Sequence, residues 1–349
     1  MGAGVVALGA AIAVVLTVAL TAEADSDQAG VIINPPPPPP SDVAVQSTAA
    51  PSAKVGAASA SRGVSAGTGG GRRSGAPSTE APSPAASSTG VPRPASWPSK
   101  ATTGVPKSKT LKAAGDVRVT KNSAVVDGLD VRGTITVEAN NVTIRNTRVT
   151  NAGKSEWGII QRAGFSGLVI VDSEIRGNGK QEMQQGIFNL GDDLTVRRTD
   201  ISQVADGIDT KQGLIEHCYL HDPSAFDGDH VDLIQVTGGP PVGKSLVIRH
   251  NTVINNLNQT SAIGLFQDFG VMHDVLVVNN YLAGGGYTVY GGDGDKGASR
   301  NVRFEHNTFG RDVYPKGGRW GPVAYFTPSG PGNTWKGNVW AVTGAPVTP

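Results

Sequence analysis

Disulfide bonds, strong net charge and helical periodicity are all missing from this chain. Its only cysteine is Cys218, so no internal disulfide can form and the folded part must be held together by packing. The formal net charge of +1 favours neither a nucleic-acid partner nor a strongly acidic one. A glycine-rich nucleotide loop, a zinc-spaced Cys/His set and a Gly-x-Ser-x-Gly elbow are missing too. We therefore expect no nucleic-acid partner and assign no residue to a metal.

The first 24 residues are expected to direct export. Residues 4–20 are almost all Ala, Val, Leu, Ile and Gly, and Thr21-Ala-Glu-Ala24 is a small-x-small pattern that a signal peptidase cleaves. No Lys or Arg precedes the apolar stretch, so an uncleaved membrane anchor stays open as the alternative. Roughly 17 apolar residues lie at the short limit for a membrane span. We expect a secreted or cell-surface protein that meets a membrane only through this segment.

Residues 25–112 are expected to be a disordered spacer. An unbroken proline run from Pro35 to Pro40 is followed by a mixture of Ser, Ala, Gly, Thr and Pro. Such a composition buries too little apolar surface to offset the entropy of ordering. A spacer of this kind favours a role in holding the folded domain, expected at 113–349, away from a membrane or through a wall layer.

A nine-residue phrase recurs along the folded domain. It reads Asn-Val-Thr-Ile-Arg-Asn-Thr-Arg-Val at 141–149, and copies begin 26 residues apart at 167 and 193. Further copies begin at 245, 274 and 301, with a contracted copy at 214–220 and a last one at 333–340. Apolar residues alternate within the phrase, as in a strand with one buried face. Because one strand cannot bury a core alone, the copies must stack in parallel.

A second strand recurs between the phrases, for example at Gly207-Ile-Asp and Leu233-Ile-Gln. About eight or nine coils, each rising about 4.8 Å, predict an all-β solenoid roughly 40 Å long. This organisation resembles the right-handed parallel β-helix proteins of the pectate lyase-like superfamily, over residues from about 115 to 340. That superfamily includes polysaccharide lyases, glycoside hydrolases, epimerases, phage tailspikes and non-catalytic adhesins. The resemblance therefore implies a fold and an extracellular polysaccharide partner, but no single reaction.

Alignment of the repeats separates the histidines that occupy a repeated turn position from those that do not. One turn position, just after the first strand, is shared by Asn146, Asp172, Arg198, His217, His250, Asn279 and His306. The three histidines in this set are predicted to belong to a stacked turn ladder. Of the other three, His273 stands beside a strand start and has no identifiable partner, whereas His221 and His230 belong to a segment with four carboxylates within twelve residues. Long solenoid insertions often carry the binding face. A solvated acidic loop, or a loop that binds Ca²⁺ structurally, is the alternative.

The second strands predict an outward-facing column of side chains. Its members are Phe188, Asp209, Gln235, Phe266 and Tyr290, and a parallel column two residues further along holds Lys211, Thr237 and Asp268. The coil spacing of about 4.8 Å is close to the rise of a sugar residue, so flanking aromatics can stack on successive rings. We expect substrate binding by Phe188, Gln235, Phe266, Asp268 and Tyr290. Loops that cover these aromatics are the alternative.

The expected catalytic residues are Asp206, Asp209, Lys211, Asp229, His230 and Asp232. Asp206 and Asp232 occupy equivalent positions on neighbouring coils. The string Ala205-Asp-Gly-Ile-Asp209 is similar to part of the Asn-Thr-Asp-Gly-Ile-Asp motif of polygalacturonases. Gly228-Asp229 falls where their Gly-Asp-Asp would lie, one coil later, but their Gly-His-Gly and Arg-Ile-Lys signatures are absent.

Three classes of function stay open on these residues. A hydrolase needs an acid and a base on either side of the glycosidic bond. A lyase needs Ca²⁺ or a basic group to neutralise a uronate, and a Lys, Arg or His to remove its C5 proton. We favour a lyase over a hydrolase, with Ca²⁺ left open as a cofactor and a monomer as the expected state. A non-catalytic carbohydrate-binding module and a purely structural envelope spacer are the alternatives.

Overall fold

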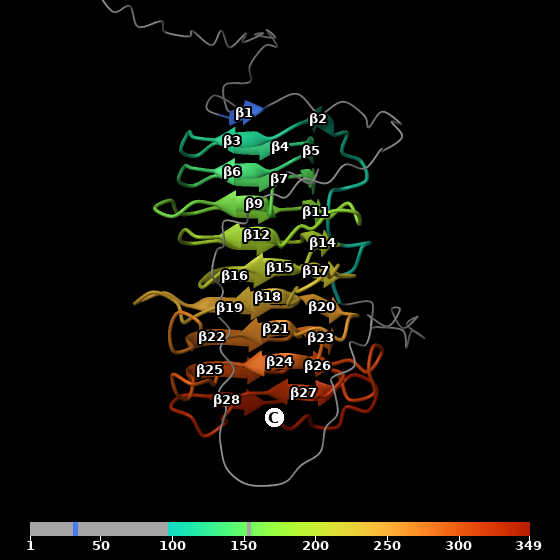
Figure 1. Cartoon of the computed structure of the whole chain (residues 1–349), viewed down its shortest axis with the longest axis vertical. Helices are drawn as coiled ribbons and strands as arrows, with labels where there is room; N and C mark the ends of the chain where they lie inside the picture. The colour runs from blue at the N-terminus through green and yellow to red at the C-terminus, as the bar shows by residue number, and fades with distance from the viewer. Residues whose placement is uncertain (1–30, 34–96, 152–154) are drawn as a thin grey trace, which may run out of the picture.

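Each recurring phrase folds into two short strands, and the residues between phrases supply a third. The computed structural model describes residues 31–33, 97–151 and 155–349. In the described chain all regular structure is β, and the strands stack in sequence order into three sheets (Figure 1). Successive strands of each sheet are parallel, apart from β1 at one end. The protein is a right-handed parallel β-helix, as the repeats predict.

Sheet 1 carries the second strands seen in the sequence. It contains β1 (Val31–Ile33), β3 (Val117–Val119), β6 (Ile135–Val137), β9 (Trp157–Gln161), β12 (Gln185–Asn189), β15 (Asp206–Asp209), β18 (Asp232–Val236), β21 (Ser261–Leu265), β24 (Tyr287–Gly291) and β27 (Gly321–Ala324).

Sheets 2 and 3 carry the two halves of each phrase. Sheet 2 contains β4 (Val125–Asp127), β7 (Thr143–Arg145), β10 (Val169–Val171), β13 (Thr195–Arg197), β16 (Gly213–Glu216), β19 (Leu246–Arg249), β22 (His273–Val278), β25 (Arg300–Glu305) and β28 (Thr334–Lys336). Sheet 3 contains β2 (Lys112–Ala114), β5 (Leu129–Arg132), β8 (Arg148–Thr150), β11 (Glu174–Arg176), β14 (Asp200–Ser202), β17 (Tyr219–His221), β20 (Thr252–Asn255), β23 (Tyr281–Gly284), β26 (Thr308–Phe309) and β29 (Val339–Trp340).

The turn between the two halves is the ladder position seen in the sequence. All seven residues assigned to it have left-handed backbone, with φ between +43° for Arg198 and +56° for His217. Asparagine and aspartate tolerate this conformation, whereas arginine and histidine enter it only where the surroundings impose it. The rings of His217 and His250 lie 4.6 Å apart on adjacent coils. The placement of the three histidines in this turn is therefore confirmed.

In the last four turns between sheets 2 and 3 the next residue is an asparagine, and the four asparagines form a buried ladder that the sequence did not predict. Asn251, Asn280, Asn307 and Asn338 are at most 2% exposed. The side-chain amide of each donates to Oδ1 of the next, at 3.0 Å at every step. These amides also satisfy buried backbone groups at the corner between sheets 2 and 3. The ladder holds consecutive coils in one register.

The interior is one continuous column of apolar side chains. Ile144, Ile170, Val196 and Ile248 from sheet 2 are fully buried, and equivalent positions of the other sheets join the same cluster. Burial of each such side chain contributes roughly 1.5–3 kcal/mol. At the C-terminal end of the column the aromatic residues Phe304, Phe309, Trp335 and Trp340 pack on one another. Packing therefore holds the coils together without disulfides.

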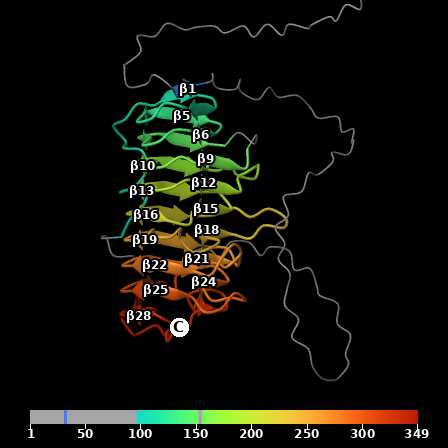
Figure 2. The ribbon, with the colours of Figure 1, turned by 90° about the vertical axis from the view of Figure 1, so that its left-hand side faces the viewer.

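Two segments of the expected spacer contact the solenoid. Strand β1 pairs antiparallel with β3 at the N-terminal end of sheet 1 (Figure 2). Residues 97–111 run along the outside of the coils, where Gly104 N donates to Arg198 O at 2.9 Å and Trp97 contacts Tyr281. No helix among the described residues is long and apolar enough to cross a membrane, and the apolar stretch at 4–20 lies outside them.

Candidate functional site

Asp206 and Asp209 lie on the same, outer side of sheet 1 because β15 turns a corner between them. A Cβ placed on Gly207 would lie 2.9 Å from the core side chain of Leu220, and Ile208 is fully buried in the same core. Two consecutive residues therefore face inward. Strict alternation would have placed carboxylates three residues apart on opposite faces. The corner brings both onto one side.

Strand β18 repeats the same corner. Leu233 and Ile234 both belong to the core, so Asp232 and Gln235 both face outward. Gln235 pairs with Asp209 in the strand ladder. The outer side of β15 and β18 therefore carries two rows of polar side chains, one at the start of the strands and one three residues later.

Hydrogen bonds connect the row at the strand starts. Asp232 N donates to Asp206 Oδ1 at 3.0 Å, and Gln184 Nε2 donates to Asp206 Oδ2 at 3.1 Å. The hydroxyl of Ser261, on β21, donates to Asp232 Oδ1. Asp232 Oδ2 is buried and makes no hydrogen bond of regular geometry within the described residues. This buried oxygen is thus a place for a proton.

Burial dominates the electrostatics of these carboxylates. Loss of solvent, with repulsion from Asp209 and Asp268, raises the pKa of Asp232 to about 7 despite hydrogen bonds from Ser261 and Gln235. Burial also raises the pKa of Asp209 to about 7, against the opposing charge of Lys211. Burial and repulsion from Asp232 also raise the pKa of Asp206 well above its usual range. Asp206, Asp209 and Asp232 are called the carboxylate trio, and near neutral pH Asp209 and Asp232 populate both their acid and their base forms.

Phe266 forms an apolar wall against Asp232. Gly264 permits this contact, because a Cβ there would lie 2.3 Å from the Phe266 ring and 2.7 Å from Asp232 Oδ1. The ring displaces water from one side of the carboxylate, which favours its protonated form. Gly264 therefore contributes to the site, because any larger side chain at this position would collide with Phe266 and Asp232.

The register of Phe266 and Asp268 was predicted wrongly. Gln235 pairs with Gly264, and Gly264 pairs with Tyr290, so Phe266 belongs two residues further along, beside Thr237. The prediction failed because Ile263 and Leu265 are both apolar and both buried, and either could have been the equivalent of Ile234. The Phe266 ring still reaches the predicted column by folding back over Gly264. Asp268 lies in the exposed segment after β21.

The Gly264→Ala variant is expected to disturb the site without unfolding the coil. The added methyl would collide with Phe266 and Asp232, so one of them must move. Displacement of the ring would readmit water and lower the pKa of Asp232 toward that of an ordinary aspartate. NMR titration of the Asp232 carboxyl should show a pKa below the wild-type value of about 7. An unchanged pKa in Gly264→Ala would contradict this role for the glycine.

Lys211 supplies a positive charge at the edge of the site. Its ammonium group lies 4.8 Å from the centroid of the Phe269 ring, which is 75% exposed. Although burial raises the pKa of Asp209, the charge of Lys211 opposes that rise. Phe269 was not identified from the sequence, because a single aromatic residue in a loop gives no periodic signal.

Asp229 and His230 do not bond to the buried trio. Asp229 Oδ2 accepts a hydrogen bond from Phe226 N at 2.6 Å, which closes the turn before β18. His230 is exposed in the same turn. The structure records no hydrogen bond from either residue to Asp206, Asp209 or Asp232 within the described chain. Asp229 and His230 therefore lie beside the carboxylate trio and do not belong to it.

His221 lies on sheet 3, away from this centre. Its Nε2 is 3.1 Å from Asp200 Oδ1 and its Nδ1 is 2.7 Å from Asp222 Oδ2. Burial opposes protonation, but the two carboxylates raise the pKa of His221 to about 9. Its ring is also stacked on Tyr219. Both ring nitrogens are occupied, so His221 is suited to an ion-paired structural role.

The expected aromatic flanks are present on the outer side of sheet 1. Phe188 pairs with Asp209 in the ladder and its ring lies 6.2 Å from that of Trp157. On the other flank the ring centroid of Tyr290 lies 5.4 Å from that of Phe266. Phe188, Asp209, Gln235 and Tyr290 thus follow one column, as the sequence predicts.

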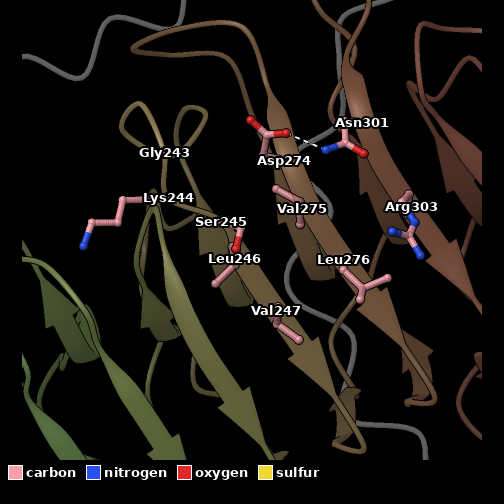
Figure 3. Close-up of a pocket in the computed structure, with 10 residues that line it drawn as sticks. All are labelled: Gly243, Lys244, Ser245, Leu246, Val247, Asp274, Val275, Leu276, Asn301 and Arg303. Carbon is pink, nitrogen blue, oxygen red and sulfur yellow. Dashed lines mark hydrogen bonds between the residues drawn. The ribbon is translucent and has the colours of Figure 1, made fainter.

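Two pockets lie on the other sheets. One, of about 430 Å³, is lined by the first residues of β19, β22 and β25 (Figure 3). Its polar groups are already engaged, since Asn301 Nδ2 donates to Asp274 Oδ1 and Lys244 pairs with Asp193. The other, of about 660 Å³, lies between residues 100–107 and sheet 3, and includes His221. Neither pocket includes a residue of the carboxylate trio.

Within the described residues, no group of three or more His, Cys, Asp or Glu side chains is arranged to hold a metal ion. No family model matches the chain, and neither a curated protein nor a solved structure matches it. Function is therefore inferred from the site itself.

Proposed function

We propose that the protein is an exported carbohydrate-active enzyme, of the glycoside hydrolase type, that acts on an extracellular polysaccharide along the outer side of sheet 1. The observation that carries the proposal is the trio of buried, mutually coupled carboxylates. Groups with strongly raised pKa values on one surface are typical of catalytic sites. Kinship with the pectate lyase-like superfamily and export through residues 1–24 belong to the same proposal.

Different surroundings suggest a different role for each carboxylate. Asp232 and Asp209 both keep a proton to about pH 7, but no cation contributes to the pKa of Asp232, so Asp232 suits the general acid. Asp209 is stabilised in its ionised form by Lys211, which suits a base or nucleophile. Asp206 accepts the backbone N–H of Asp232 and the amide of Gln184, so it acts as a positioning residue.

The charge balance favours hydrolysis over β-elimination. A lyase must neutralise the carboxylate of a uronate, but this site offers one ammonium group, from Lys211, against the trio and Asp268. The fraction of Asp209 and Asp232 that is ionised near pH 7, together with Asp268, would repel a second anion in a site of low dielectric. The lyase hypothesis, which the residue types favoured, therefore has less support from the geometry than the hydrolase hypothesis.

A non-catalytic carbohydrate-binding module is the second candidate. The exposure of Phe269 and the aromatic flanks favour it, since exposed rings can hold a sugar chain without turnover. The raised pKa values of three carboxylates have no function in such a module.

Product analysis separates these candidates. The purified full chain should release new reducing ends from at least one neutral polysaccharide, without the ultraviolet absorbance of an unsaturated uronate. Appearance of that absorbance would establish the lyase instead. Binding to a polysaccharide with neither product would support the module.

A further inference from the structure

Tyr325 has a left-handed backbone conformation, which is unfavourable for a bulky side chain. It follows β27 with φ of +54°, in the left-handed region, and its side chain is 64% exposed. A bulky L-residue rarely adopts this backbone conformation, because its Cβ comes too close to the following carbonyl oxygen. Its carbonyl accepts a hydrogen bond from Asp293 N at 2.8 Å, which holds the turn. Because the ring is mostly exposed, core packing does not explain why an aromatic residue occupies this place.

The strained turn places the Tyr325 ring against the site flank. Its centroid lies 5.7 Å from that of Tyr290, with the planes within 15° of parallel. Tyr290 lies 5.4 Å from Phe266, and Phe266 contacts the Asp232 side of the trio. The three rings thus form a continuous series that starts at the proposed general acid and runs toward the C-terminal coils.

The series follows the coil axis. Strands β21, β24 and β27 are consecutive in sheet 1, and Tyr290 pairs with Ala324, the residue before Tyr325. At about 4.8 Å per coil, the two steps between these three strands span about 10 Å, the centre-to-centre length of about three sugar residues in an extended chain. The series therefore has the length of a row of subsites.

We propose that Phe266, Tyr290 and Tyr325 form the substrate-binding subsites on one side of the cleavage point, and that they select an unbranched neutral glycan. This inference rests on the proposed function. Tyr325, which is 64% exposed, offers ring surface to the apolar face of a sugar. Tyr290 is stacked on Tyr325 and meets Tyr287 edge-on, so the rings form one aromatic surface that supplies no cation for a uronate. Repulsion by Asp268 and by the ionised fraction of Asp209 and Asp232 acts in the same direction. Tyr325 is the outermost binding residue, and the left-handed turn holds its ring next to Tyr290.

The test uses Tyr325→Gly in the full chain, with Tyr325→Phe as the matched control. Glycine adopts a φ near that of Tyr325 freely, so the variant loses the ring while the turn is retained. The ratio of the KM for long neutral oligosaccharides to the KM for the shortest substrate should rise about tenfold in Tyr325→Gly. Tyr325→Phe should behave like the wild type on both.

The outcomes distinguish this inference from the proposed function. An unchanged ratio of the two KM values in Tyr325→Gly, with active enzyme, would overturn the subsites and leave the hydrolase standing. Retention on an immobilised neutral polysaccharide that Tyr325→Gly loses, without any cleavage, would support the subsites and overturn the enzyme. Exclusive binding or cleavage of uronate polymers would overturn the neutral specificity.

Discussion

Replacement of Asp232 by asparagine is expected to reduce turnover of a susceptible glycan about 10³-fold, with little change in KM. Asparagine keeps the shape of the side chain and can still accept the hydrogen bond from Ser261, but it cannot release a proton. General acid–base catalysis contributes typically 10²–10⁴-fold, and the proposed acid would be lost entirely. The measurement is steady-state release of reducing ends, compared with Asp229→Asn. That control lies outside the buried trio and should remain within about threefold of the wild type.

The same substitution should stabilise the fold at alkaline pH. The pKa of Asp232 is raised from 3.8 to about 7 in the folded protein, so the folded state binds more protons than the unfolded state between these values. The free energy of unfolding therefore falls as pH rises from about 4 to about 7 and stays low above pH 7. A shift of this size corresponds to about 4 kcal/mol, at 1.36 kcal/mol per pKa unit. The asparagine of the variant carries no charge, so the variant should escape this loss.

Urea denaturation at pH 5 and pH 8 measures this second effect. Asp232→Asn should be more stable than the wild type at pH 8 by about 2–4 kcal/mol, with a smaller difference at pH 5. Loss of activity combined with a gain of stability is the behaviour of a group held in a costly environment for catalysis. Loss of both would indicate that Asp232 is a structural residue.

The period of the repeats predicts the fold because each coil obeys the same physical constraint. Ile144, Ile170 and Val196 recur at 26-residue intervals, and a strand that buries one face must stack with its copies. Left-handed turn positions such as Asn146 follow from the same alignment. The repeats do not predict how far the ordered region extends, because Trp97 and β1 contact the coils but do not belong to any repeat.

The candidate site follows from the sequence only in part. Asp206, Asp209 and Asp232 were identified from their equivalence across coils, but their common surface depends on the corner at Gly207-Ile208, which a strict period of two does not contain. The predicted alignment of Phe266 was wrong by two residues, because the sequence does not show whether Ile263 or Leu265 is the equivalent of Ile234. Contacts made by loops and glycines, which the repeat does not specify, determine the surroundings of the three carboxylates.

Replacement of Asn280 by alanine is expected to destabilise the fold by about 3 kcal/mol. Its Oδ1 accepts hydrogen bonds from the backbone and side chain of Asn251, and its Nδ2 donates to Ile248 O and to Asn307 Oδ1. Alanine would leave these buried groups without partners, and each unsatisfied group costs about 1–3 kcal/mol.

The neighbouring asparagine provides a matched control for Asn280→Ala. Asn279 is exposed in the left-handed turn with φ of +52°, so Asn279→Gly should change stability by less than about 0.5 kcal/mol. Urea midpoints followed by circular dichroism give both values. Equal effects at the two positions would mean that the turn conformation, rather than the buried amide ladder, fixes the register of the coils. A large effect at Asn280 alone would show that the ladder stabilises the very coils, β20 to β26, that carry the aromatic subsites on their adjoining strands.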